Sequence, residues 1–118
     1  MSEKSQSFVD QLLEKTREGK ISWTTAFEDG QFKTVLPGGQ LAFVVQVKGD
    51  ARRILMLDER QEAVLDETIT KAETEGEPEH HPKIKLYAGI GELQDLARSQ
   101  ALQVNVKLVQ AEQLLNLI

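Results

Sequence analysis

Cysteine is absent from this chain of 118 residues, which excludes disulfides, thiolate zinc sites and cysteine nucleophiles. Aromatic residues make up 5% of the sequence, and histidine occurs only at positions 80 and 81. No apolar run approaches the length of a membrane span, and the first seven residues lack the apolar core of a signal peptide. We therefore expect one cytoplasmic domain over residues 1–118, with no membrane partner.

Acidic residues are concentrated in one segment of the chain. The formal net charge is -5, and residues 61–82 hold seven acidic residues against one basic residue, Lys71. Surfaces that bind nucleic acid are normally basic, so we expect no nucleic-acid partner. The acidic run instead indicates a possible contact with a basic protein, and its candidate residues are Glu73, Glu75, Glu77 and Glu79.

Two glycine-containing turns organise residues 32–66 into a predicted antiparallel meander of four strands. Gly38–Gly39 and Gly49–Asp50 supply the positive backbone angles that two-residue hairpins need. Residues 58–61 form a third, polar turn. These turns predict that Phe43 faces Met56, that Ile54 faces both Val45 and Leu65, and that Arg53 faces Asp66.

Because side chains alternate along a strand, these registers define two faces of the sheet. The predicted core face holds Phe32, Thr34, Leu36, Leu41, Phe43, Val45, Ile54, Met56, Ala63 and Leu65. The second face is also partly apolar, with Val35, Ala42, Val44, Leu55, Leu57 and Val64. A sheet with one wet face should alternate more cleanly, so we expect a helix or a partner to cover the second face.

Helical spacing of apolar residues occurs at both ends of the chain. Residues 5–18 form a predicted amphipathic helix that Gly19 ends. Residues 68–82 are polar and acidic and predict a mobile loop. A helix is then expected over 84–102, weakened by up to about 1 kcal/mol at each of Gly89 and Gly91, with a break at 103–104 and a last helix from Asn105. The predicted fold class is α+β: an N-terminal helix, a four-stranded antiparallel β-meander and one or two C-terminal helices.

Residues 12–23 (LLEKTREGKISW) and 93–106 (LQDLARSQALQVNV) carry a resemblance to known proteins. The helix-plus-tryptophan opening and the closing pattern of leucine, alanine–arginine and alanine–leucine resemble a group of small uncharacterised bacterial proteins. The resemblance implies a β-meander framed by helices and a bacterial source. It implies no activity, cofactor or functional residue.

The candidate chemical motifs favour structural interpretations. His80 and His81, with Glu77 and Glu79 nearby, lack the further convergent ligands that a metal site needs. The neighbouring carboxylates at 58–59 and 66–67 suit turns and ion pairs better than acid–base catalysis, and no base accompanies a serine or threonine nucleophile. We expect no catalytic, cofactor-binding or metal residues, and hence no enzyme.

Exposed apolar surface is the remaining functional signal, and it predicts a small protein-interaction or regulatory module that self-associates, with a homodimer among the expected forms. The candidate interaction surface comprises Val35, Val44, Leu55, Leu57, Val64, Leu114, Leu115 and Ile118. One alternative is a closed monomer whose first and last helices cover opposite faces of the sheet. Others are an immunity- or antitoxin-like protein that binds a basic partner through the acidic run, and a small ligand-binding or enzyme domain with a pocket near Trp23 and Tyr87.

Overall fold

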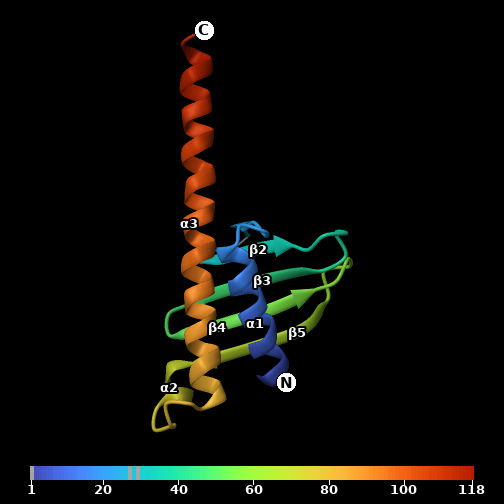
Figure 1. Ribbon diagram of the computed structural model, residues 1–118, viewed down its shortest axis with the longest axis vertical. Coiled ribbons are helices and arrows are strands. Elements are labelled where there is room, and N and C mark those ends of the chain that lie inside the picture. The colour runs from blue at the N-terminus through green and yellow to red at the C-terminus, as the bar shows by residue number, and fades with distance from the viewer. Residues whose placement is uncertain (1, 27, 29) are drawn as a thin grey trace.

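A five-stranded antiparallel meander and two long helices form the molecule (Figure 1). The computed structural model describes residues 2–26, 28 and 30–118, and their side chains except at positions 2 and 105. The elements, in chain order, are α1 (Ser2–Arg17), β1 (Thr24–Thr25), β2 (Gln31–Val35), β3 (Ala42–Lys48), β4 (Ala51–Leu57), β5 (Ala63–Thr70), α2 (Lys71–Thr74) and α3 (Pro82–Asn116). The α+β class and the meander are confirmed, with one strand more than expected.

The additional strand is β1, which pairs with β2 at the edge of the sheet. Thr24 faces Lys33, and Thr25 faces Phe32. Both residues of β1 are exposed threonines, so the strand shows no alternation of apolar and polar side chains. Two adjacent β-branched residues are the only feature of the sequence that favours a strand here.

The two glycine hairpins have the predicted registers, whereas the third register is wrong. Phe43 faces Met56 and Val45 faces Ile54, but Ile54 faces Glu67, and Leu65 faces Met56. The third turn closes between Asp58 and Glu62, where the Asp58 amide bonds the Glu62 carbonyl, and this shifts the expected pairing by one residue. A bulge between Met56 and Leu57 adds a second residue of shift.

The net shift of two residues keeps Leu65 on the core face, because side chains alternate with a period of two. Leu65 is buried as predicted, and Ile69 joins the core face further along β5. Ala63, which we placed on that face, is instead exposed opposite Leu57.

Both long helices lie on the same face of the sheet (Figure 1). A single cluster joins Val9, Leu12 and Leu13 of α1, Leu86, Ile90, Leu93, Ala97 and Ala101 of α3, and Phe32, Phe43, Val45, Ile54, Leu65 and Ile69 of the sheet, together with Trp23. The alternative in which the first and last helices cover opposite faces is therefore wrong. No helix of the described residues covers the second face.

α3 is one continuous helix, so the predicted break at 103–104 is wrong. Its start lies at Pro82, where the Nδ1 of His81 accepts a hydrogen bond from the Lys83 amide and caps the helix. The loop before it is shorter than expected, because β5 continues to Thr70 and residues 71–74 form α2. Asn105 lies inside the helix, and its side chain lies outside the described part of the chain.

The two glycines that weaken α3 serve its packing. A Cβ on Gly89 would lie 2.8 Å from Cγ1 of Val9, so this glycine lets α1 approach α3 closely. A Cβ on Gly91 would lie 2.3 Å from a guanidinium nitrogen of Arg52, which rests against the helix there. Both glycines are inside the helix because neighbouring groups occupy the space of a side chain.

α3 is longer than the sheet that it crosses (Figure 1). Five strands spaced about 4.8 Å apart span roughly 20–25 Å, whereas 35 residues of helix span about 52 Å. We call residues 102–118 the C-terminal extension, because α3 continues there past the edge of the sheet. The longest dimension of the molecule, 60 Å, lies along this helix.

Replacing Gly89 with alanine should destabilise the protein by up to about 2 kcal/mol. Overpacking against Val9 costs roughly 1–3 kcal/mol, and the gain in helix propensity returns about 1 kcal/mol. Urea unfolding followed by circular dichroism measures the change, and Ser99→Ala, at an exposed position of α3, is the control and should not destabilise. A Gly89→Ala protein that is more stable than wild type would contradict the close helix contact.

Candidate interaction site

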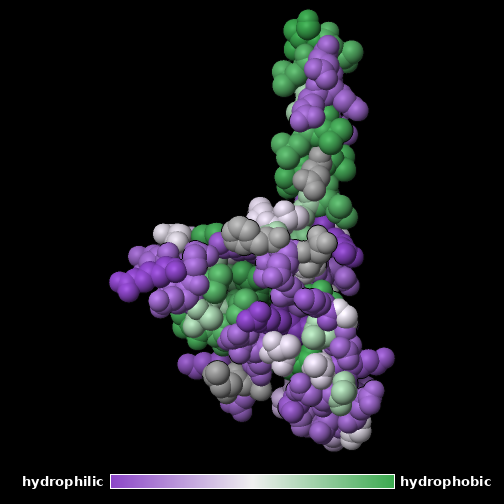
Figure 2. All heavy atoms as spheres, turned by 180° about the vertical axis from the view of Figure 1, so that it is seen from behind, coloured by the Kyte–Doolittle hydropathy of each residue, from purple (hydrophilic) through white to green (hydrophobic). Residues whose placement is uncertain are grey.

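The C-terminal extension exposes nine large apolar side chains. They are Leu102, Val104, Val106, Leu108, Val109, Leu114, Leu115, Leu117 and Ile118. Val104 is the least exposed of the nine, at 49%, and Leu117 is 82% exposed. Figure 2 shows the extension as a mainly apolar column above a mainly polar body. Such a continuous apolar surface marks an interaction site in a soluble protein.

One stripe of the extension continues the stripe that holds α3 on the sheet. Leu86, Ile90, Leu93 and Ala97 are fully buried at spacings of three and four residues. The same spacing continues through residues that we call the body-side stripe: Ala101, Val104, Leu108, Ala111, Leu115 and Ile118. Val104 lines a cavity together with Trp23, so the stripe still points toward the sheet side beyond the body.

A second apolar stripe lies on the opposite side of the extension. Leu102, Val106 and Val109 line one shallow surface hollow, and Leu117 continues their helical spacing. We call these four residues the outer stripe. Lys107 and Glu112 are the charged residues of the extension.

A small cavity lies where the extension leaves the body. Its volume is about 170 Å³, and it is lined by Trp23, Thr24, Thr25, Ala101 and Val104. The exposed threonines belong to the edge strand β1. The cavity therefore joins the edge of the sheet to the beginning of the body-side stripe.

Trp23 is held rigidly at the base of this cavity. Its side chain is 1% exposed and belongs to the core cluster. Its indole N–H donates to Oγ1 of Thr16 at 2.9 Å, and its backbone N–H donates to Oε1 of Gln100 at 2.9 Å. The hydrogen bonds to α1 and α3 fix one wall of the cavity.

The second sheet face offers less exposed apolar surface than its sequence indicated. Val44 and Leu55 are 4% and 8% exposed although no described helix covers them. Polar pairs lie beside them: Gln46 donates to Glu28 at 2.7 Å, and Arg53 makes two hydrogen bonds to Asp66. Figure 2 shows apolar atoms in the middle of this face with polar side chains around them.

The remaining candidates on this face lie nearer its margins. Val35 is the last residue of β2, and Val64 lies in β5 beside the bulge; both side chains are more than half exposed. Leu57 is half-buried. They do not form a continuous stripe like that of the extension.

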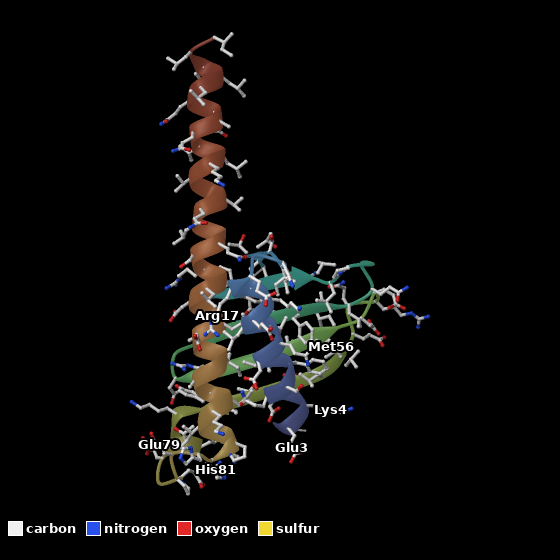
Figure 3. The ribbon with its side chains drawn as sticks, viewed as in Figure 1. Glu3, Lys4, Arg17, Met56, Glu79 and His81 are labelled. Carbon is white, nitrogen blue, oxygen red and sulfur yellow. The ribbon has the colours of Figure 1, made fainter. Side chains whose placement is uncertain are left out.

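The acidic candidates lie at the end of the molecule opposite the extension. Glu73, Glu75, Glu77 and Glu79 are exposed on α2 and the following loop. Figure 3 shows Glu79 and His81 at this end. Glu73 lies 3.8 Å from Lys83, and Glu77 lies 3.4 Å from His81, so basic groups of the chain meet two of the four carboxylates.

Trp23 and Tyr87 do not share a pocket. Tyr87 precedes Ala101, which lines the Trp23 cavity, by 14 residues of α3, or about 21 Å along the helix. The Tyr87 ring is covered by the Arg52 guanidinium, 4.0 Å from its centre, and its hydroxyl donates to the Asp50 carbonyl. The space between α3 and the sheet near Tyr87 is filled by buried Leu86 and Ile90.

A cleft lies beside α3, next to the hairpin of β3 and β4. It has a volume of about 460 Å³ and includes Gly30, Arg52, Gln94, Asp95 and Arg98 in its lining. Gln94 donates to the Gly30 carbonyl at 2.7 Å, and Arg52 donates to the Tyr87 carbonyl at 2.8 Å. Gln94 therefore ties the turn before β2 to α3, and Arg52 ties β4 to the same helix.

In the part of the chain that the structure describes, no group of three or more histidine, aspartate or glutamate side chains is placed to hold a metal ion. No helix among those residues combines the length and apolar character needed to cross a membrane.

Comparisons with known proteins find no significant match to this chain. No protein-family model matches the sequence, and searches of curated proteins and of solved structures find no significant match.

The Arg53–Asp66 pair predicts a pH-dependent contribution to stability. Hydrogen bonds from Arg53 lower the pKa of Asp66 below its usual value. The contribution of the pair to stability is therefore fully present above the pKa of an unfolded aspartate, about 3.9. It is lost as the pH falls through the lower pKa of the folded state. Because the side chains are 39% and 42% exposed, we expect about 0.2–1 kcal/mol.

Urea unfolding of wild type and Asp66→Asn between about pH 3 and pH 8 tests this contribution. The gap between them should be constant above about pH 5 and close below the usual aspartate pKa. Asp95→Asn removes an exposed carboxylate of α3 and serves as the control. A gap that persisted unchanged to the lowest pH would contradict a role for the charged pair.

Proposed function

We propose that this protein is a non-enzymatic interaction module that self-associates through its C-terminal extension. The observation that carries the proposal is the exposure of nine large apolar side chains on a helix that leaves the body. Most of the stability of a helix in a protein comes from packing of its apolar face rather than from intrinsic propensity. A partner that covers the extension provides that packing.

The extension is favoured over the second sheet face by the distribution of exposed apolar residues. On the sheet face, Val44 and Leu55 are already buried, and Val35 and Val64 are separated from each other. On the extension, Leu114, Leu115 and Ile118 are neighbours on two adjoining turns and are at least 64% exposed. The larger gain from removing apolar surface from water is therefore at the extension.

Replacing Leu108 or Leu115 with glutamine should weaken self-association more than 100-fold. A homodimer contains two copies of each substitution, and each copy loses at least about 1.5 kcal/mol of side-chain burial, so the total of about 3 kcal/mol exceeds two factors of ten. Sedimentation equilibrium or light scattering over a range of concentrations measures the change.

The matched control is Val35→Gln with Val64→Gln, which alters equally exposed residues of the sheet. These substitutions should leave association unchanged. Circular dichroism should show a folded body for all variants, because none of the altered side chains belongs to the core cluster. A wild-type protein that stays monomeric at every concentration would refute self-association, and loss of association in the control alone would transfer the interface to the sheet.

A second candidate function is the binding of a basic protein by the acidic segment. It is supported by the position of Glu73, Glu75, Glu77 and Glu79, exposed together at the end of the molecule away from the extension. Electrostatic contacts of this kind weaken as salt shortens the screening length from about 10 Å at 0.1 M to about 3 Å at 1 M.

Replacing these four glutamates with glutamine should abolish capture of a basic partner, while the extension variants should retain it. The measurement is pull-down with wild-type and variant protein at low and high salt, followed by identification of the salt-sensitive proteins. Capture that the four substitutions or high salt leave unchanged would remove this candidate.

A further inference from the structure

The body-side stripe has the same spacing in both directions. Its six residues are separated by three, four, three, four and three positions. Two antiparallel copies can therefore align so that Ala101 faces Ile118, Val104 faces Leu115 and Leu108 faces Ala111. In this alignment the first residue of one copy's stripe faces the last residue of the other copy's stripe, so the two kinds of core position alternate as an antiparallel helix pair requires.

The residues that meet in each layer differ in size. Alanine stands opposite isoleucine or leucine in two of the three layers, and valine stands opposite leucine in the other. Facing large with small side chains fills the space between helices without voids. A parallel pair would instead place Ala111 against Ala111 and Leu115 against Leu115, which alternates under-filled and crowded layers.

The position of the body excludes a parallel pair on this stripe. The stripe continues the face on which Leu86, Ile90 and Leu93 contact the sheet and α1. A parallel partner helix packed on the extension would continue down into the space that the sheet occupies (Figure 1). A parallel pair would bring Lys107 near Glu112, but exposed ion pairs contribute only about 0–1 kcal/mol, which cannot offset that collision.

The cavity at the base of the extension fits the antiparallel alignment. In this register, Ile118 of the second copy lies opposite Ala101, and Ala101 lines the cavity beside Trp23 and β1. An apolar side chain from a second copy would cover the exposed edge of that cavity. The cavity was not used to choose the register, so it supports the alignment independently.

We propose that two copies of this chain pair through antiparallel body-side stripes, each placing Ile118 beside the Trp23 cavity of the other copy. The proposal rests on the proposed self-association and specifies its geometry. The overlap of 17 residues is about 25 Å long. It involves fewer residues than the roughly 20–30 per side of a standard interface, so the pair is a reversible dimer that depends on concentration.

The absence of native cysteine allows a direct test by cross-linking. The single variants Val104→Cys and Leu115→Cys are purified separately, mixed in equal amounts under reducing conditions and treated with a short bis-maleimide. The mixture should give at least tenfold more covalent dimer than either variant alone. Leu108→Cys mixed with Ala111→Cys should behave in the same way.

The matched control is Val106→Cys mixed with Gln113→Cys. These residues would lie at the same height in the pair but point away from the body-side stripe, so they should not cross-link. Cross-linking of Val104→Cys or Leu115→Cys alone would show a parallel pair, and preferential cross-linking of the control mixture would show pairing through the outer stripe. Either result overturns the proposed geometry.

Light scattering of the untreated proteins separates the two proposals. A dimer without the 104–115 cross-link overturns the antiparallel geometry and leaves self-association standing. A monomer at all concentrations overturns both. A dimer with the expected cross-links supports both, and Leu115→Gln should then lower the cross-linking yield of the Leu108 and Ala111 cysteines at a given concentration.

Discussion

The packing of α3 across one face of a narrow sheet is the constraint on which the rest of the structure depends. Leu86, Ile90, Leu93 and Ala97 are fully buried between α1 and the strands. The sheet is about half as wide as the helix is long. Half of α3 is therefore core, and the other half has no part of the described body beneath it.

This arrangement also explains why the two faces of the sheet differ. α1 and α3 share the core face, where Gly89 permits their close approach. The second face is covered at its centre by its own polar side chains, including the Arg53–Asp66 pair. Apolar residues occur on both faces, but the second face buries its central pair, Val44 and Leu55, without a helix.

The fold was predictable from the sequence wherever a local signal specified the geometry. The glycines at 38–39 and 49 adopt positive φ, and both hairpin registers follow from them. The third register was not predictable, because it depends on Gln61 at positive φ and on a bulge that no glycine or proline marks. Gly89 and Gly91 predict only a weakened helix, whereas tertiary contacts with Val9 and Arg52 account for them.

The candidate site was predictable in part. Leu114, Leu115 and Ile118 were expected to need burial, and the structure leaves them exposed on the extension. The uninterrupted helix was missed because polar residues at 103 and 105 resemble a boundary. The continuous three-and-four spacing from Leu86 to Ile118 is the signal that could have revealed it. The cavity beside Trp23 has no sequence signal, since it brings together residues that are far apart in the chain.

One helix serves both the core of the body and the apolar extension, so the proposed self-association would be coupled to folding. A second copy that covers the extension would favour the helical state of residues 102–118, which continue without a break from the turns packed on the sheet. On dilution, the uncovered extension would lose helical order first, while the turns buried against the sheet would hold. The molecule would then register its own abundance as helix content, with Ala101 marking the border between the permanent and the conditional part.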